Sequence, residues 1–144
     1  MALSDLGYHL RGAVFTYQNA LSDYKYCKLI DPTCEDGFSI EPYRTCELFI
    51  GMHFHSIVLA LQNHIPVIAI SYSDKVRRLM EEYQLEAYCI QPEDAELPHR
   101  LVCLAKTLSE PAVMADVVDK IRQGNEAARQ RLVHFERELR RVIS

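Results

Sequence analysis

The chain lacks the features that assign proteins to several broad classes. It has no excess of positive charge, since its formal net charge is −4, and non-specific nucleic-acid binding requires a basic surface. Its most apolar region, residues 57–70, contains three consecutive polar residues and Pro66, so it is too polar to span a bilayer. No internal repeat or low-complexity linker divides the chain. We therefore expect one globular domain over residues 1–144, with no nucleic-acid partner and no transmembrane segment.

The cysteines also lack a pattern that would indicate disulfides or a metal site. There are five, an odd number, and none of them form a Cys-x-x-Cys pair. We expect free thiols and a reducing, cytoplasmic location. Cys89 falls in a predicted apolar strand and Cys103 on the apolar face of a predicted helix, so both are expected to be buried. Residues 1–12 contain no apolar stretch preceded by positive charge, so no secretory signal is expected.

Predicted strands and helices alternate along the chain. A helix that begins near Ser22 is expected to turn Leu29 and Ile30 inward. Short β-rich or apolar runs predict the strands, and apolar residues at helical spacing predict the helices. The predicted strands are 13–17, 48–50, 67–70 and 87–90, and the predicted helices are 40–46, 53–63, 73–84 and 101–108. This alternation is typical of an α/β fold, and we expect a Rossmann-like three-layer domain with a mainly parallel sheet.

The longest helical pattern begins at Pro111 and runs to the end of the chain. Apolar residues recur in it at helical spacing, with Gly124 and Asn125 either interrupting the helix or only weakening it. The later apolar residues are Leu132, Phe135, Leu139 and Val142. The arginines and glutamates between them predict a solvated, ion-paired helix face, and attraction to an acidic membrane is the alternative interpretation.

Polar residues follow two neighbouring predicted strands. His53 and His55 come after the strand 48–50, and Ser73 and Lys75 come after the strand 67–70. The carboxyl ends of parallel strands meet at one sheet edge, which is where open α/β sheets bind ligands. An imidazole can donate or accept a proton near neutral pH, and a helix start with a nearby lysine can hold an anion.

Each of these residues also has a purely structural interpretation. A histidine at a helix start often only caps or packs, and Ser73 with Lys75 could be an ordinary capped helix with a solvated lysine. His53 and His55 could share a metal ion only on an extended backbone, because residues two apart on a helix point to different sides. No further ligand lies at suitable spacing, so no metal site is expected.

The segment that contains both turns resembles the C-terminal half of the polysaccharide pyruvyl transferases. The first matching string is Ile50-Gly51-Met52-His53-Phe54-His55-Ser56, and the second runs from Ile65 to Val76 and includes Ser71-Tyr72-Ser73-Asp74-Lys75. The resemblance covers roughly half of the chain. This chain departs from the family pattern at His53, where the family has arginine.

The resemblance implies an enzyme that transfers a pyruvyl group from phosphoenolpyruvate to a sugar hydroxyl in cell-surface polysaccharide synthesis. It implies a catalytic role for His55, substrate-binding roles for His53, Ser56, Ser73 and Lys75, and no cofactor besides phosphoenolpyruvate as donor substrate. It also implies one half of a two-lobed GT-B fold. The other lobe is then expected from a second chain or from a homo-oligomer.

Two other functions also fit the sequence. A histidine cannot form the bidentate pair of hydrogen bonds that an arginine forms with a carboxylate or phosphate. His53 and the missing lobe therefore allow a non-catalytic remnant that binds an anionic ligand or a partner protein. The second alternative is the nucleotide-sugar-binding half of a glycosyltransferase. That function requires an acidic ribose clamp, which Glu93-Asp94 matches poorly.

Overall fold

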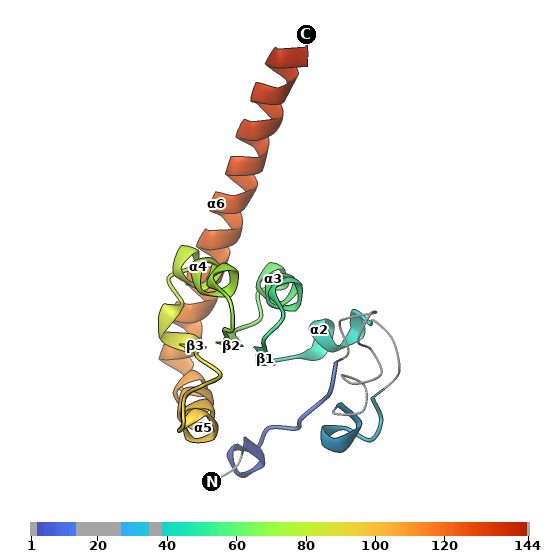
Figure 1. Cartoon of the computed structure of the whole chain (residues 1–144), viewed down its shortest axis with the longest axis vertical. Coiled ribbons are helices and arrows are strands. Elements are labelled where there is room, and N and C mark those ends of the chain that lie inside the picture. Colours follow the sequence, from blue (N-terminus) through green and yellow to red (C-terminus); the bar gives the residue numbers. More distant parts are fainter. Residues whose placement is uncertain (1–2, 14–26, 35–38, 144) are drawn as a thin grey trace.

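The computed structural model describes residues 3–13, 27–34 and 39–143 (Figure 1). After a 3-10 turn at Leu3–Leu6 come α2 (Glu41–Thr45), β1 (Phe49–Gly51), α3 (Phe54–Gln62), β2 (Val67–Ile70), α4 (Asp74–Glu82), β3 (Cys89–Ile90), α5 (Leu97–Leu108) and α6 (Pro111–Ile143). Residues 14–17 of the predicted first strand and the predicted helix start at Ser22 lie outside the described residues.

Three parallel strands form one sheet in the described part of the chain, in the order β1-β2-β3. Phe49 pairs with Val67 and Ala69 with Cys89, so β2 is central. Its residues Val67, Ile68 and Ala69 are buried, as expected for apolar, largely β-branched residues in a strand covered on both faces. The predicted strand 87–90 is shorter than expected, Cys89–Ile90, because Glu86–Tyr88 form a 3-10 turn instead.

Helices cover both faces of this sheet. Figure 1 shows α3 and α4 on one face and α5 on the other. Ile57 and Leu61 of α3, Met80 of α4 and Leu108 of α5 are completely buried with the strands in one core. The parallel sheet and its three layers confirm the predicted Rossmann-like α/β domain.

Two successive helices end in the same way, with a non-glycine residue in the left-handed conformation. His64 after α3 has φ 60° and Gln84 after α4 has φ 56°. Ile65 N–H donates to the carbonyl of Ala60, and Leu85 N–H donates to that of Met80, which is the hydrogen bond of a Schellman motif. Each motif turns a buried apolar residue, Ile65 or Leu85, back into the core.

Three predictions about burial and helix bounds are wrong. Leu29 and Ile30 are exposed rather than turned inward. Cys103 is also exposed, because α5 buries its Ala105 and Leu108 side instead. The helix α5 begins four residues before the predicted start at 101, since a proline is tolerated in the first helical turn, where its missing N–H has no partner to lose.

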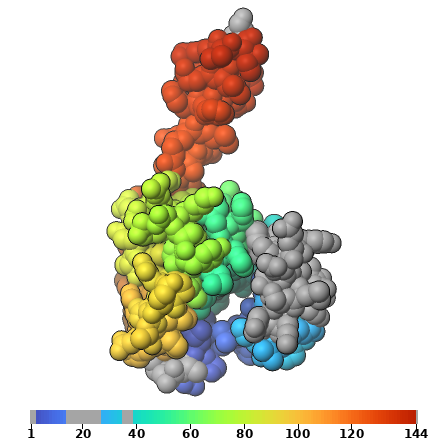
Figure 2. Space-filling view, in the orientation of Figure 1, coloured from blue at the N-terminus to red at the C-terminus, as the bar shows by residue number. Residues whose placement is uncertain are grey.

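The helix α6 is continuous through Gly124 and Asn125. Its first half packs against the domain, with Val117 and Ile121 buried, and its second half projects beyond it (Figures 1 and 2). A side chain at Gly124 would lie 2.4 Å from Cδ1 of Tyr83, so glycine allows the close approach of α6 to the end of α4. In the described residues no helix is long and apolar enough to cross a membrane.

One hydrogen-bonded chain fixes the middle of α6 to two other helices. The Tyr83 hydroxyl donates to Oδ1 of Asn125 at 2.9 Å. The Nδ2 of Asn125 donates to the carbonyl of Leu61 at 2.9 Å. Asn125 thereby joins α6 to the C-terminal ends of both α3 and α4.

Candidate functional site

The turns after β1 and β2 open on the same edge of the sheet. The strands are parallel, and Gly51 at the end of β1 pairs with Ala69 near the end of β2. The first turn leads through His53 into α3, and the second leads through Ser73 into α4. The parallel topology therefore brings the two sequence-predicted turns to one edge.

His53 lies at the start of α3 and joins its first turn through the backbone. It is the N-cap residue, in extended conformation, and its carbonyl accepts hydrogen bonds from Ser56 Oγ at 2.7 Å and Ile57 N–H at 3.1 Å. Ser56 is buried, so its hydroxyl serves the helix start. The half-buried His53 side chain lines a cavity beside β1.

His55 has different surroundings from His53. It lies in the first turn of α3 and is exposed. Its ring meets the ring of Phe54 edge-on, with centroids 5.4 Å apart and an interplanar angle of 84°. His55 is not among the described residues that line the cavity. Its imidazole therefore lies on the surface, outside the cavity.

The second turn is held by the buried Ser71. Its N–H donates to the carbonyl of Ile90 and its Oγ to the carbonyl of Ser73, both at 2.8 Å. Ser73 is the N-cap residue of α4, as predicted, but among the described residues its hydroxyl makes no capping hydrogen bond. Lys75 is exposed, and the neighbouring Asp74 forms an ion pair with Arg77 at 2.8 Å.

A cavity of about 800 Å³ lies between β1 and the N-terminal segment, which is within the size range of small-molecule sites. Figure 2 shows the hollow between this segment and the body of the domain. The cavity brings His53 and Ser56 together with His9 and Arg11. Ser73 and Lys75, like His55, are not among its described lining residues.

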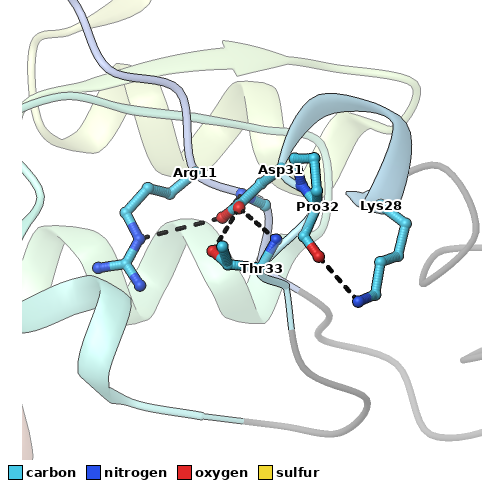
Figure 3. Close-up of polar contacts among 6 residues, drawn as sticks. Arg11, Lys28, Asp31, Pro32 and Thr33 are labelled. Atoms are coloured by element: carbon cyan, nitrogen blue, oxygen red, sulfur yellow. Dashed lines mark hydrogen bonds and ion pairs between the residues drawn. The ribbon is translucent and has the colours of Figure 1, made fainter.

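Asp31 fixes the segment that carries Arg11 (Figure 3). Its carboxylate accepts hydrogen bonds from the Thr33 hydroxyl at 2.6 Å, the Thr33 N–H at 2.9 Å and the Gly12 N–H at 3.2 Å. Arg11 Nε lies 4.0 Å from the same carboxylate. The Thr33 hydroxyl, above all, lowers the pKa of Asp31 below its ordinary value. Asp31 therefore stays ionised and holds the N-terminal wall of the cavity.

Three polar groups in the cavity wall, on Tyr8, Tyr43 and Cys46, stay neutral. Burial raises the pKa of Tyr43 to about 12, and its ring packs on Phe49 with centroids 5.4 Å apart. Burial also raises the pKa of the Cys46 thiol, which donates to the carbonyl of Leu48, and the pKa of Tyr8. The permanent charges in this cavity wall therefore belong to Arg11 and Glu47.

The cavity contains groups that can bind a small anion, and the carboxylate of Glu47 lines it as well. Arg11 supplies a permanent positive charge and His53 an imidazole to one cavity. Among the described residues, no group of three His, Cys, Asp or Glu side chains could hold a metal ion. Sequence reasoning missed Arg11 and His9, because they lie in a short segment with no periodic pattern or motif.

Comparison with known proteins agrees with the resemblance found in the sequence. The family model described as polysaccharide pyruvyl transferase matches residues 40–74. This range covers α2, β1, α3 and β2, and it ends within the second turn. No curated protein and no solved structure matches the chain. The segment 40–74 is thus a polysaccharide pyruvyl transferase-like segment within a chain of 144 residues.

Proposed function

We propose that this domain acts as a pyruvyl transferase lobe that binds phosphoenolpyruvate and passes its pyruvyl group to a saccharide. The observation that carries the proposal is the family match over residues 40–74, which contains the His53 turn and most of the second turn at one sheet edge. The acceptor would be a cell-surface polysaccharide precursor in the cytoplasm. The thiols of Cys46, Cys89 and Cys103, which form no disulfide, support that reducing location.

The reaction requires protons to move at two stages. The methylene carbon of phosphoenolpyruvate gains a proton while one sugar hydroxyl adds to the neighbouring carbon and loses its own proton. A second hydroxyl of the sugar then attacks the same carbon, loses its proton to a base and closes a ketal as phosphate leaves. His55 is the proposed acid and base, because its exposed imidazole at the sheet edge can exchange protons near neutral pH.

Binding of the donor requires positive charge near its carboxylate and phosphate. The imidazole of His53 cannot form the paired hydrogen bonds that an arginine forms, but Arg11 lines the same cavity and its guanidinium can form them to either anion. We propose that Arg11 takes over the binding role of the family's arginine. Ser56, Ser73 and Lys75 are proposed as further donor contacts at the helix starts.

The proposed catalytic residue needs a covering surface. His55 is exposed, and an open site leaves water in contact with the reacting atoms. We propose that this domain is one half of a GT-B arrangement and that the facing lobe comes from a second chain.

A binding measurement tests the donor site without requiring the facing lobe. Titration of the chain with phosphoenolpyruvate should show binding that Arg11→Gln weakens by about tenfold or more, since a charge-assisted hydrogen bond contributes about 1.5–3 kcal/mol. Arg44→Gln is the matched control, because Arg44 is exposed, pairs with Glu41 and is not among the described lining residues. Absence of binding, or equal losses in both variants, contradicts the proposed site.

A non-catalytic anion-binding lobe is the second candidate, and the replacement of the family's arginine by His53 favours it. His53→Arg separates the two functions when phosphate release is measured with saccharide acceptors and a facing lobe from a family member. A weakened enzyme should gain activity, whereas a remnant should only bind the donor more tightly. A ribose clamp has less support, because Asp94 pairs with Arg100 and accepts the Glu96 N–H at the start of α5.

A further inference from the structure

The projecting half of α6 carries an apolar stripe on its surface. Every residue from Arg129 to Ile143 is exposed. The stripe consists of large residues that are 66, 62, 46 and 84% exposed, in the order Leu132, Phe135, Leu139 and Val142. Apolar residues exposed at regular spacing on one helix face mark an interaction surface.

The stripe follows a heptad repeat. Its residues alternate spacings of three and four, so Leu132 and Leu139 occupy a positions and Ala128, Phe135 and Val142 occupy d positions. The repeat continues backwards through Asn125 to Ile121, which is completely buried against the domain. One continuous stripe is therefore covered by the domain in its first half and exposed in its second half.

We propose that the projecting half of α6 pairs with the same segment of a second copy of this chain as an antiparallel two-stranded coiled coil. In this pairing, Leu132 lies opposite Phe135 of the second copy, and Ala128 lies opposite Leu139. The overlapping segment from Asn125 to Val142 is about 27 Å long at about 1.5 Å per residue. The surface is separate from the cavity, whose described lining contains no residue of α6.

Charges beside the stripe select this register. Arg129 faces Glu136 of the second copy and Arg131 faces Glu138, and symmetry repeats both contacts. A shift by one heptad in one direction would place Glu136 and Glu138 each against its own counterpart. A shift in the other direction would place Arg129 and Arg131 against theirs. Like charges at these flanking positions destabilise a coiled coil, so the register with opposite charges is favoured.

The ion pairs already present on α6 are compatible with these contacts. Arg129 pairs with Glu126 at 3.0 Å and Arg131 pairs with Glu82 at 3.0 Å, both at exposed positions. Exposed pairs contribute little stability, so sharing them costs little. A guanidinium has five donors and a carboxylate about four acceptor sites, which allows one partner within the chain and one across the interface.

The packing of α6 also favours the antiparallel orientation. The first half of the stripe is occupied by the domain, where α3 and α5 contact α6 and Ile121 is buried. A parallel partner would have to run through that occupied space. In the antiparallel register, Val142 of the second copy reaches the level of Asn125, where α6 is hydrogen-bonded to Tyr83 and Leu61, so the pairing ends at the edge of the covered part.

The mass of the full chain in solution tests the proposal. Sedimentation equilibrium should show a species of twice the 16.6 kDa of one chain that dissociates on dilution. Phe135→Asp should weaken the dimer by at least about 30-fold, as expected for a central apolar anchor. Val133→Asp is the matched control, because Val133 is also an exposed apolar residue of α6 but lies off the stripe. Circular dichroism should show that both variants are folded.

Charge reversal tests the register and the orientation. Arg129→Glu with Arg131→Glu, and separately Glu136→Arg with Glu138→Arg, should each weaken self-association by about tenfold, and an equimolar mixture of the two variants should restore it. Arg129→Glu alone should weaken an antiparallel dimer but not a parallel one, in which Arg129 would face Gly124. Three results would overturn the proposal. The unmodified chain could be a monomer at about 100 µM, or the equimolar mixture of the two charge-reversed variants could fail to dimerise. The third result is a monomeric chain that sediments with anionic phospholipid vesicles.

Discussion

Replacing Gly124 with alanine should destabilise the domain, although alanine is the better helix former. Helix propensity alone would favour alanine by about 1 kcal/mol. The added Cβ would lie 2.4 Å from Cδ1 and 2.9 Å from Cγ of Tyr83. These ring atoms lie near the backbone, so a change of side-chain rotamer does not easily remove the clash. The ring is buried and its hydroxyl is fixed by Asn125.

The expected size follows from these two opposing effects. Overpacking a buried contact costs about 1–3 kcal/mol, and the upper end applies because the nearest atoms include the base of the ring. After the gain in propensity, Gly124→Ala should lower the free energy of unfolding by about 2 kcal/mol and the melting temperature by about 6 °C. Urea and thermal unfolding, followed by circular dichroism, measure both quantities.

A double-mutant cycle separates the clash from other effects of the substitution. With Tyr83→Ala the ring is gone, so Gly124→Ala in that background should raise stability by about 1 kcal/mol. Gln123→Ala, at an exposed position of the same turn, should change stability by less than about 0.5 kcal/mol. If Gly124→Ala stabilises the protein that retains Tyr83, the close packing of α6 against α4 is wrong.

Three further predictions concern helix ends, acid stability and catalysis. Gln84→Gly, and likewise His64→Gly, should raise the free energy of unfolding by about 1 kcal/mol, because glycine adopts a positive φ without strain; equal or lower stability in urea denaturation would contradict this. The pKa of Asp31 is lowered in the folded protein, so its carboxylate adds stability above its ordinary pKa of about 3.9, and this stability is lost as the pH falls through the folded value. Asp31→Asn should therefore flatten the loss of melting temperature between about pH 5 and pH 2. A variant whose melting temperature falls in parallel with that of the original protein would refute this prediction. His55→Gln should abolish phosphate release in the assembled enzyme and leave phosphoenolpyruvate affinity unchanged, and a variant that retains full turnover would exclude His55 as the acid and base.

The central β1-α3-β2-α4 unit could be predicted because its signals are local and agree with one another. The short, largely β-branched run 67–70 favours a buried strand, and the polar turns after the strands 48–50 and 67–70 mark the helix starts. The same local signals misplaced Leu29, Ile30 and Cys103. Apolar side chains lie on one side of their segments, but the sequence does not show which side meets the core.

The sequence predicts the sheet edge at which the two turns meet, but it does not predict the cavity beside β1. Parallel strands oblige both turns to meet at one edge, so the location followed from topology. Topology does not show that His53 lines the cavity while His55 lies outside it, because that difference depends on the extended backbone of the N-cap residue His53. Arg11 reaches the cavity through its segment's attachment to Asp31, a contact between residues 20 positions apart that no periodic pattern encodes.

The hydrogen bond from Asn125 to Leu61 also couples distant parts of the molecule mechanically. The nine residues of α3 form a stiff rod of about 13 Å, with Leu61 near one end and His55 near the other. The hydrogen bond therefore joins the long terminal helix to the end of α3 that lies opposite His55.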